Sequence, residues 1–487
     1  MRKQVKTLII VGMVIVVLAL ATGALFLFGS GGGGESSSPA SQHELAATFV
    51  DKTSDDVQSV TVQNEKGEFT AQRGEDTLTI SLLSGLATNS TELENLAVAA
   101  SGFYAERLIE ENPSRPADFG LDPAAAQVSV TYTDGSTFSI ELGSASASGG
   151  RYARIPGETK VYLLTETTDS FFYGVNHFVS NVIFDAGLTE EQKDEAVFLK
   201  AELGGTLHPQ PIVIESNPYK NVETHPAGYV DKAITSPYFA GASVSVDNAF
   251  PSGLTKILAS SVEAVVTDPA QLAQYGLDQP YSTLSFSFQS GGQTYNGSLW
   301  IGSKNDEGNY YATTADKRVV YVVKADNVSY MELTDRQLLY PIPVLINIQL
   351  LSSFDIDASQ VTAKFEPVVT EENGSKTVTG GVANGNGVSA GCIKKLYESL
   401  GKLSADEITD REPAGERLMT VTYRFSDGAT APITVDYYYD TARTVLVKVN
   451  GLENAPNYIM QRKAIDSFLN KTQKALNGEV VVPSATD

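Results

Sequence analysis

Cysteine, histidine and tryptophan are scarce in this 487-residue chain, which has one Cys, four His and one Trp. The single thiol, Cys392, has no partner for an intramolecular disulfide, so the folded chain must hold together by packing alone. Zinc-site spacing is also missing, because no two of His43, His177, His208 and His225 are three or four residues apart. We therefore expect no metal site, no cofactor, and a structural or surface role for each histidine.

Motifs of catalysis and calcium binding are expected to be missing as well. We expect no Gly-x-Ser-x-Gly nucleophile elbow, and Cys392 has no histidine near it in the sequence. Adjacent carboxylates such as Glu190-Glu191 carry no information about hydrolysis in so acidic a chain. Residues 305–309 and 355–359 are rich in oxygen ligands but lack calcium-loop spacing, so we interpret them as polar turns. We predict no catalytic residue and a protein that is not an enzyme. A hydrolase whose polar groups meet only in the fold is the third hypothesis.

Long hydrophobic runs are confined to the N-terminus. Arg2, Lys3 and Lys6 precede residues 8–28, in which no residue is charged. A helix rises about 1.5 Å per residue, so this run is long enough to span a bilayer core of about 30 Å. Because the basic cluster keeps its own side cytoplasmic, everything after residue 28 is expected outside the cytoplasm.

A cleaved signal peptide is the alternative for the same segment, with Ala19-Leu20-Ala21 as the cleavage site. Signal peptides have apolar runs of about 7–15 residues, whereas this run continues past the candidate site. We therefore predict an uncleaved, single-pass transmembrane anchor over residues 7–28, with residues 1–6 as its cytoplasmic flank. The Gly/Ser-rich start of residues 29–54 predicts a flexible linker.

Positive charge is in short supply beyond the anchor. Without the three N-terminal cations, 32 Lys and Arg face 58 Asp and Glu, a net charge of −26. Such an ectodomain repels nucleic acid and anionic lipid headgroups, so no nucleic-acid partner is expected. Its length of about 450 residues exceeds one ordinary core and suits about three domains.

Part of the ectodomain repeats itself. The segment Asp118-Phe119-Gly120-Leu121-Asp122-Pro123 recurs as Gln274-Tyr275-Gly276-Leu277-Asp278-Gln279-Pro280. Further matches follow at a shared spacing of 159 residues: Gly143 with Gly302, Tyr152-Ala153 with Tyr311-Ala312, and Val161-Tyr162 with Val320-Tyr321. A constant spacing over several positions indicates a duplication rather than chance.

Each copy also contains the pattern of a β-hairpin. Apolar and polar residues alternate before and after Asp134-Gly135, and they do so again around Gly291-Gly292. A third, degenerate copy turns at Asp427-Gly428 and lacks the Gly-Leu-Asp signature.

A helix is expected before each hairpin, over residues 93–110, 253–266 and 390–403. Cys392 falls in the third of these helices, where it is expected to be a small buried hydrophobe. The predicted fold class is α+β: tandem repeated modules, each a mainly antiparallel β-meander packed with one helix, after an N-terminal transmembrane helix. The predicted modules cover residues 55–185, 186–335 and 336–480, and residues 481–487 form a tail.

At Phe119-Gly120-Leu121-Asp122 and Tyr275-Gly276-Leu277-Asp278, and in the strands that follow, the chain resembles the bacterial domain-of-unknown-function family 4340. The resemblance covers residues 55–335, and the rest more weakly. Family members often carry a Trp in the strand before the helix, whereas Trp300 lies in a returning strand. The resemblance implies an N-terminal anchor and an accessory role beside ABC-type transport systems of the kind associated with gliding-motility auxiliary proteins. It offers no catalytic residues to carry over.

The strand Asp436-Tyr437-Tyr438-Tyr439-Asp440 is the candidate contact surface. Successive side chains of a strand face opposite sides, so at least one of Tyr437, Tyr438 and Tyr439 is expected to be exposed. Exposed aromatic rings stack on sugars or anchor partner proteins. Tyrosine also packs well inside sheets, which is the structural alternative.

The first hypothesis for function is a non-enzymatic, membrane-anchored, extracytoplasmic accessory or scaffold protein. Its partners would be ABC transporter subunits or other envelope proteins. The alternative is a cell-surface protein that binds polysaccharide or cell wall through Tyr437, Tyr438 and Tyr439. Both hypotheses place the chain in the cell membrane as a single-pass protein with its C-terminal ectodomain outside the cytoplasm.

Overall fold

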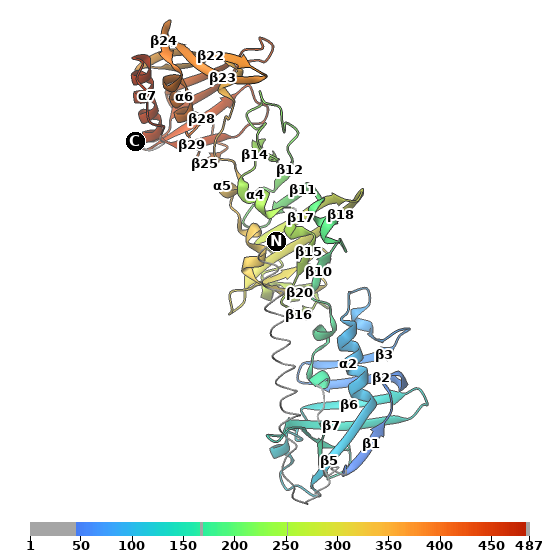
Figure 1. The fold of residues 1–487 in the computed structure, drawn as a ribbon. Coiled ribbons are helices and arrows are strands. Elements are labelled where there is room, and N and C mark those ends of the chain that lie inside the picture. The colour runs from blue at the N-terminus through green and yellow to red at the C-terminus, as the bar shows by residue number, and fades with distance from the viewer. Residues whose placement is uncertain (1–44, 166–168, 251, 484–487) are drawn as a thin grey trace, which may run out of the picture. The chain divides into compact units, whose positions relative to one another are not determined.

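The computed structural model describes residues 45–165, 169–250 and 252–483 (Figure 1). The predicted anchor over residues 7–28 and most of the predicted linker lie outside these described residues. Within the described ranges, no helix is both long and apolar enough to cross a bilayer.

The described chain divides into two compact units. The smaller unit holds residues 45–53, 101–125 and 139–165, and the remaining described residues make up the larger unit. Strands dominate, and they form four mainly antiparallel sheets accompanied by a few helices. The predicted α+β class with mainly antiparallel sheets is therefore confirmed.

The smaller unit is built on part of the first sheet, with neighbouring strands in the order β1-β5-β9-β8-β7. The bounds of these strands are β1 Ala47–Asp51, β5 Gly102–Glu110, β7 Thr137–Ala145, β8 Arg151–Arg154 and β9 Val161–Leu164. Strand β5 buries Phe103 and Ala105, which alternate with half-buried neighbours, as a strand with one covered face requires.

The Gly-Leu-Asp signature marks a close backbone approach in this unit. Gly120 ends a short 3-10 helix, Pro116–Phe119, in the left-handed conformation with φ 67°. A Cβ atom on Gly143 would lie 2.0 Å from the carbonyl oxygen of Phe119, so only glycine fits there. The buried Leu121 then anchors the turn in the core.

The same device recurs in the larger unit. Gly276 ends the 3-10 helix Pro269–Tyr275 with φ 66°, and a Cβ atom on Gly302 would lie 2.2 Å from the carbonyl oxygen of Tyr275. Leu277 is fully buried, as Leu121 nearly is. The repeated signature is thus a requirement of packing, since each glycine pair lets two backbone segments touch.

The larger unit contains the other part of the first sheet, in the order β6-β2-β3-β4, and the helix α2. The bounds are β2 Val57–Asn64, β3 Gly67–Arg73, β4 Leu78–Ile80, α2 Ser90–Ser101 and β6 Ala126–Tyr132. Helix α2 buries Leu93, Leu96 and Ala100, which recur at helical spacing.

The second sheet has the order β14-β13-β12-β11-β17-β18-β19-β20-β16. The strand bounds are β11 Val197–Gly204, β12 Ile212–Ser216, β13 Lys232–Ser236, β14 Ala240–Gly241, β16 Ser261–Val265, β17 Ser282–Ser290, β18 Gln293–Lys304, β19 Tyr310–Thr313 and β20 Val319–Val323. The nearby helices are α3 Glu190–Asp194, α4 Val244–Ala249 and α5 Asp335–Leu338. A separate two-stranded sheet pairs β10 Val182–Asp185 with β15 Lys256–Leu258.

The third sheet has the order β24-β23-β22-β21-β26-β27-β28-β29-β25. The strand bounds are β21 Leu351–Ala358, β22 Val361–Glu372, β23 Ser375–Ala383, β24 Asn386–Ser389, β25 Glu407–Thr409, β26 Arg417–Phe425, β27 Ile433–Tyr439, β28 Thr444–Asn450 and β29 Asn457–Gln461. Helices α6 Ala390–Leu400 and α7 Arg462–Leu476 pack against each other and against the sheet (Figure 1). Their apolar faces share one core with the sheet, which includes Phe354, Leu396 and Phe468.

The second and third sheets share one strand order. With the nine strands of each sheet numbered in chain order, both sheets read 4-3-2-1-6-7-8-9-5. Both parts of the first sheet follow the same scheme. The order β4-β3-β2-β6 matches 3-2-1-6, and β7-β8-β9-β5 matches 7-8-9-5, with β1 added beside β5. The first sheet thus differs from the other two in lacking the fourth strand of this scheme and in having β1 beside β5.

The predicted hairpin turns are confirmed. Each lies between the sixth and seventh strands of its sheet, and Gly135, Gly291 and Gly428 all adopt positive φ. Asp-Gly and Gly-Gly are the turn residues that tolerate this conformation.

Two of the three predicted helices are wrong in part or entirely. Of the first, predicted over residues 93–110, only residues 93–101 are helical, as part of α2, because β5 begins at Gly102. Residues 253–266 contain β15 and β16 instead of a helix, and the helix of this sheet is α4. Short apolar runs fit both the helical and the strand period, so spacing alone could not separate them. The third prediction is confirmed by α6.

Two isolated β-bridges in the larger unit each pair a residue just before a helix with the segment that follows the last strand of a sheet, and we call each of them a join. In the first join, Thr88 pairs antiparallel with Val179, which belongs to the segment that follows the last strand of the first sheet. Two backbone hydrogen bonds flank it: Asn89 N–H to Phe178 O at 2.8 Å, and Ser180 N–H to Ala87 O at 2.9 Å.

The second join has the same pattern. Ala242 pairs antiparallel with Leu339, which follows the last strand of the second sheet. The flanking bonds are Ser243 N–H to Leu338 O at 2.8 Å and Tyr340 N–H to Gly241 O at 2.8 Å. In both joins the bridging residue stands two positions before a helix, α2 or α4, and its partner is buried.

Candidate functional site: the tyrosine strand and its arginine network

The predicted tyrosine strand is β27, which lies between β26 and β28 in the third sheet. Tyr437 is 3% exposed and belongs to the core, opposite Met419 and Val447. Burial raises the pKa of its phenol. Tyr438 is half-buried, and Tyr439, at the end of the strand, is 41% exposed. The strand therefore offers two rings to a partner, not three.

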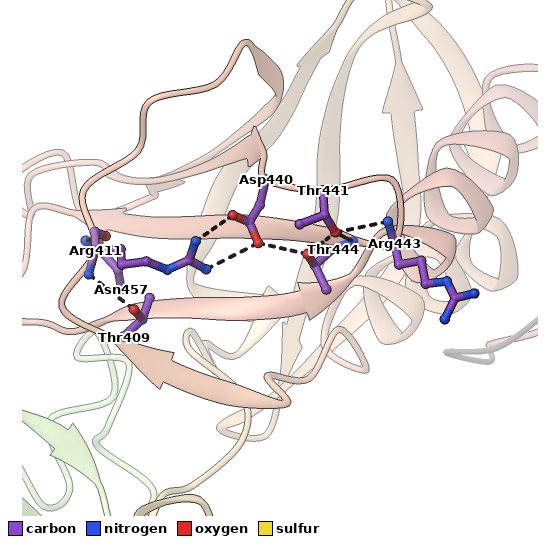
Figure 2. Close-up of polar contacts among 7 residues, drawn as sticks. All are labelled: Thr409, Arg411, Asp440, Thr441, Arg443, Thr444 and Asn457. Atoms are coloured by element: carbon purple, nitrogen blue, oxygen red, sulfur yellow. Dashed lines mark hydrogen bonds and ion pairs between the residues drawn. The ribbon is translucent and has the colours of Figure 1, made fainter.

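A bidentate ion pair lies directly beyond Tyr439 (Figure 2). The Arg411 guanidinium donates to both carboxylate oxygens of Asp440, from Nη1 at 2.8 Å and from Nη2 at 3.3 Å. Thr444 Oγ1 also donates to Asp440 Oδ2, at 2.8 Å. Figure 2 shows the threonines Thr441 and Thr444 on the far side of the carboxylate from the arginine, with their hydroxyls 2.6 Å apart.

The charges in this network stabilise each other. Hydrogen bonds from Arg411 and then from Thr444 lower the pKa of Asp440 from its ordinary value. The same contact with Asp440 raises the pKa of Arg411. The Asp440 side chain is only 12% exposed, while that of Arg411 is 52% exposed. Such a carboxylate is held ionised and is already bonded at both oxygens, so its role is to fix the loop rather than to take up a proton.

The network fastens the loop between β25 and β26 to the end of β27. Asn457 Nδ2 donates to the backbone oxygen of Arg411 at 2.9 Å, and the backbone N–H of Tyr439 donates to Glu416 O at 2.8 Å. A Cβ atom on Gly415 would lie 2.0 Å from the Tyr439 carbonyl oxygen, so the loop can approach only with glycine there.

A cationic side chain lies over the exposed tyrosine ring, and a second one lies in the turn that follows the strand. The Arg462 guanidinium, at the start of α7, lies over the Tyr439 ring, 5.4 Å from its centre. Arg443 lies in the turn between β27 and β28 and is exposed. Tyrosine and arginine are the residue types most enriched at the energetic centres of protein interfaces. This arrangement is suited to contact with a protein partner and holds no constellation for proton transfer.

The histidines lie far apart in the chain and in different surroundings. His43 is outside the described residues. His177 stacks on Tyr173 at 3.6 Å, and Nε2 of its ring lies 3.2 Å from a Glu92 carboxylate oxygen. In the described ranges, no group of three or more His, Cys, Asp or Glu side chains could hold a metal ion.

The other two histidines are packed into the fold. His208 is almost fully buried, and its Nδ1 lies 2.8 Å from an Asp335 carboxylate oxygen. His225 stacks on Tyr219 at 3.8 Å, and its Nδ1 accepts the backbone N–H of Ala227 at 3.2 Å. Burial lowers the pKa of His225 from its ordinary value.

The oxygen-rich segments serve the fold in different ways. Residues 305–309 form the turn between β18 and β19, in which the Asn305 side chain accepts the backbone N–H groups of Glu307 and Asn309. Residues 355–358 belong to β21, so the interpretation of residues 355–359 as a turn is wrong. Asp355 there accepts a hydrogen bond from Arg424 at 3.0 Å.

One motif was missed in the sequence. Gly387-Val388-Ser389-Ala390-Gly391 fits the Gly-x-Ser-x-Gly pattern between a strand and a helix, so the expectation that the chain has no such pattern is wrong. An elbow nucleophile sits on a strained turn, whereas Ser389 has an ordinary extended backbone with φ −68° and ψ 155°. Its hydroxyl accepts the Cys392 N–H at 3.2 Å and caps α6. The chain has no histidine beyond His225, so none in the third sheet could serve Ser389 as a base.

Cys392 is fully buried in α6, and burial raises the pKa of its thiol. Its Sγ donates to the Ala475 carbonyl oxygen of α7 at 3.4 Å. The predicted role as a small buried hydrophobe is confirmed.

The joins are the features that sequence reasoning missed entirely. Thr88 and Val179 are separated by some 90 residues, and no local pattern marks either of them. Only the shared position two residues before a helix could have suggested them, and that signal needs the helix boundaries first.

Comparison with known protein families gives one match. The model of the domain of unknown function DUF4340 matches residues 79–193 and 242–418, which is more than half of the chain. The second matched region ends before the tyrosine strand. No curated protein matches the chain.

Proposed function

The chain belongs to the family of the domain of unknown function DUF4340, and on this premise we propose that it is a membrane-anchored, non-enzymatic accessory or scaffold protein. Residues 7–28 would form the single-pass anchor, and residues 29–54 the linker to an ectodomain outside the cytoplasm. The uncharged run of residues 8–28, with basic residues only on its N-terminal side, supports this topology.

The ectodomain is proposed to be a tandem array of three modules. The observation that carries this proposal is the strand order 4-3-2-1-6-7-8-9-5, which the second and third sheets share and the first sheet follows apart from strand 4, together with the two joins of identical hydrogen-bond pattern. In repeat proteins each unit contacts its neighbours, and the array presents an extended binding surface. Such an architecture is suited to holding partners in place.

The partners are proposed to be subunits of an ABC-type transport system or other envelope proteins. The family resemblance supports the transporter, and the exposed Tyr439 ring with Arg462 and Arg443 supports contact with a protein. The net charge of −26 on the ectodomain argues against nucleic acid.

The proposal is tested by crosslinking in native membranes with the full-length chain. A photoreactive phenylalanine analogue replaces Tyr439, and in a matched control it replaces Val98, which is 51% exposed on α2. A chain of residues 1–40 alone controls for proteins that associate with the anchor.

Recovery of a transporter permease or ATPase well above the anchor control supports the accessory role. Enrichment at position 439 over position 98 would place the contact at the tyrosine strand. If neither site yields a protein above the anchor control, the accessory role is wrong. Crosslinking to wall polymer instead would favour the ligand-binding alternative.

A further inference from the structure

The outer edge of β24 has no strand beside it in the described chain. β24 is the edge strand of the third sheet and pairs on one side with β23 (Figure 1). The turn Asn384-Gly385 joins the two strands, and residues 384–387 are exposed. An unpaired edge of this kind is a template for another strand.

The two joins show what binds at the corresponding place in the other sheets. In each, the residue directly before the helix-capping position bridges to an incoming strand, as Thr88 does with Val179 and Ala242 does with Leu339. The incoming residue is buried in both cases, with Val179 4% and Leu339 3% exposed. The bridge therefore combines two backbone hydrogen bonds with one buried apolar side chain.

In the third sheet the equivalent residue is Val388, since Ser389 is the N-cap of α6. Val388 pairs with Gly381 of β23. The two-residue turn Asn384-Gly385 closes on Ala383 and Asn386, which therefore form a hydrogen-bonded pair. Because backbone groups alternate sides along an antiparallel strand, Gly387 C=O and Ser389 N–H then point away from β23. These are the groups that correspond to Gly241 C=O and Ser243 N–H in the second join.

No strand of the described chain occupies this edge. The chain leaves β29 directly into α7, and the segment after α7 runs along α6, where Lys402 Nζ donates to Pro483 O at 3.1 Å. Val480 of that segment is 59% exposed and would lie 3.5 Å from a Cβ atom on Gly391, beside the open edge. An exposed apolar side chain thus lies close to Ser389, where an incoming apolar side chain could contact it.

We propose that the outer edge of β24 binds an extended segment of a partner protein by strand addition. The partner places an apolar residue opposite Val388, donates a backbone N–H to Gly387 C=O and accepts the N–H of Ser389. The sequences at the existing joins, Phe178-Val179-Ser180 and Leu338-Leu339-Tyr340, define the chemistry of the segment at the contact: three uncharged residues in an extended conformation, with an apolar residue at the centre. This site deepens the proposed scaffold role, on which its biological use rests, by naming a surface for the partner.

The test uses the purified full-length chain in detergent and two fluorescent synthetic peptides. Their sequences are those of residues 175–182 and 335–342, and scrambled peptides of the same composition are the controls. The chain's own segments occupy the two joins at high effective concentration, so an added peptide cannot easily displace them. The edge of β24 is then the site left for the peptide. Saturable binding, measured by fluorescence anisotropy, is expected for the two native sequences and not for the scrambled ones.

Two variants at one position isolate the backbone donor. Ser389→Pro and Ser389→Ala both lose the hydroxyl that caps α6, but only proline also removes the N–H. The backbone at Ser389, with φ −68°, already suits proline. We expect Ser389→Ala to bind peptide within about twofold of the natural chain, and Ser389→Pro to bind at least about tenfold more weakly.

Equal binding by the two variants, with circular dichroism spectra that match, would overturn the proposal, as would the absence of binding to the natural chain. Either result leaves the crosslinking test of the scaffold role unaffected. Conversely, peptide binding without any crosslinked partner would support the binding site at β24 and contradict the proposed role beside a transporter.

Discussion

The second and third sheets have the same strand order but end differently. After β20, the last strand of the second sheet, the chain runs past Ala242, with which Leu339 forms a join. It then continues into the third sheet. After β29, the third sheet turns directly into α7, which covers the core of that same sheet. The comparison teaches that strand order defines each sheet, whereas the segment after the last strand decides whether a sheet connects to a neighbour or closes on itself.

The largest expected effect comes from removing a side chain by which α7 packs on the third sheet. Phe468 is 2% exposed in the core between α7 and the third sheet. Phe468→Ala should lower the free energy of unfolding by about 3–5 kcal/mol, because it removes a large buried ring and leaves a cavity. Urea unfolding followed by circular dichroism measures the change. Val482→Ala, at a site 71% exposed, is the control and should change it by less than about 0.5 kcal/mol. Similar effects of both variants would show that α7 does not close the sheet.

The second test compares the occupied join with the open edge. Leu339→Ala should cost about 2–4 kcal/mol, since the side chain is buried where the second sheet meets its exit segment. Val388→Ala removes a half-buried side chain at the equivalent place in the third sheet and should cost less than about 1 kcal/mol. Thermal unfolding of both variants under one condition gives the ratio. If Val388→Ala costs as much as Leu339→Ala, then the edge of β24 is not open.

A smaller effect is expected at the tyrosine strand. Asp440→Asn should cost about 1 kcal/mol at neutral pH, because the charge-assisted bonds to Arg411 weaken. The folded-state pKa of Asp440 is lowered from 3.8, so its stabilisation is present above that value. It is lost as the pH falls through the folded pKa. Unfolding of both chains in a pH series should therefore show curves that converge in acid. A constant difference down to the acid limit would contradict this account.

The smallest expected effect is a pH dependence of stability that comes from His225, close to the second join. The half-buried His225 ring packs on Tyr219 and against Phe239, near the second join. Its folded-state pKa is lowered from 6.5, so the unfolded chain takes up a proton first as the pH falls. Stability should be fully present above about pH 6.5 and should decline as the pH falls toward the folded pKa. His225→Gln should lack this decline between about pH 7.5 and about pH 5.5 in thermal melts. If the melting temperature falls with pH equally in both chains, the decline comes from groups other than His225.

Local chemistry made much of each sheet predictable. Asp134-Gly135, Gly291-Gly292 and Asp427-Gly428 predict turns between strands through glycines that adopt positive φ, and the alternation around them predicts the strands. The Gly-Leu-Asp signature was found from its recurrence, although its reason, a backbone contact at Gly143 and Gly302, appears only in three dimensions.

The failures occurred where two periods competed. Residues 96–105 carry apolar side chains that fit a helix, yet the chain changes from α2 to β5 at Gly102. A Cβ atom at Gly102 would lie 2.6 Å from the Tyr104 ring, so the break depends on a contact that spacing does not show. In the same way, three consecutive tyrosines predict an exposed ring but not which one, because burial of Tyr437 is decided by Met419 and Val447 on neighbouring strands.

The buried thiol of Cys392 has a practical consequence. Its sulfur is fully enclosed between α6 and α7, and burial holds it in the unreactive protonated form. Because it is the only cysteine in the chain, an engineered cysteine on the surface would be the sole site for a maleimide dye or spin label. Pairs of such labels can therefore be introduced in the natural background, and distances between the sheets can be followed without first removing a native residue.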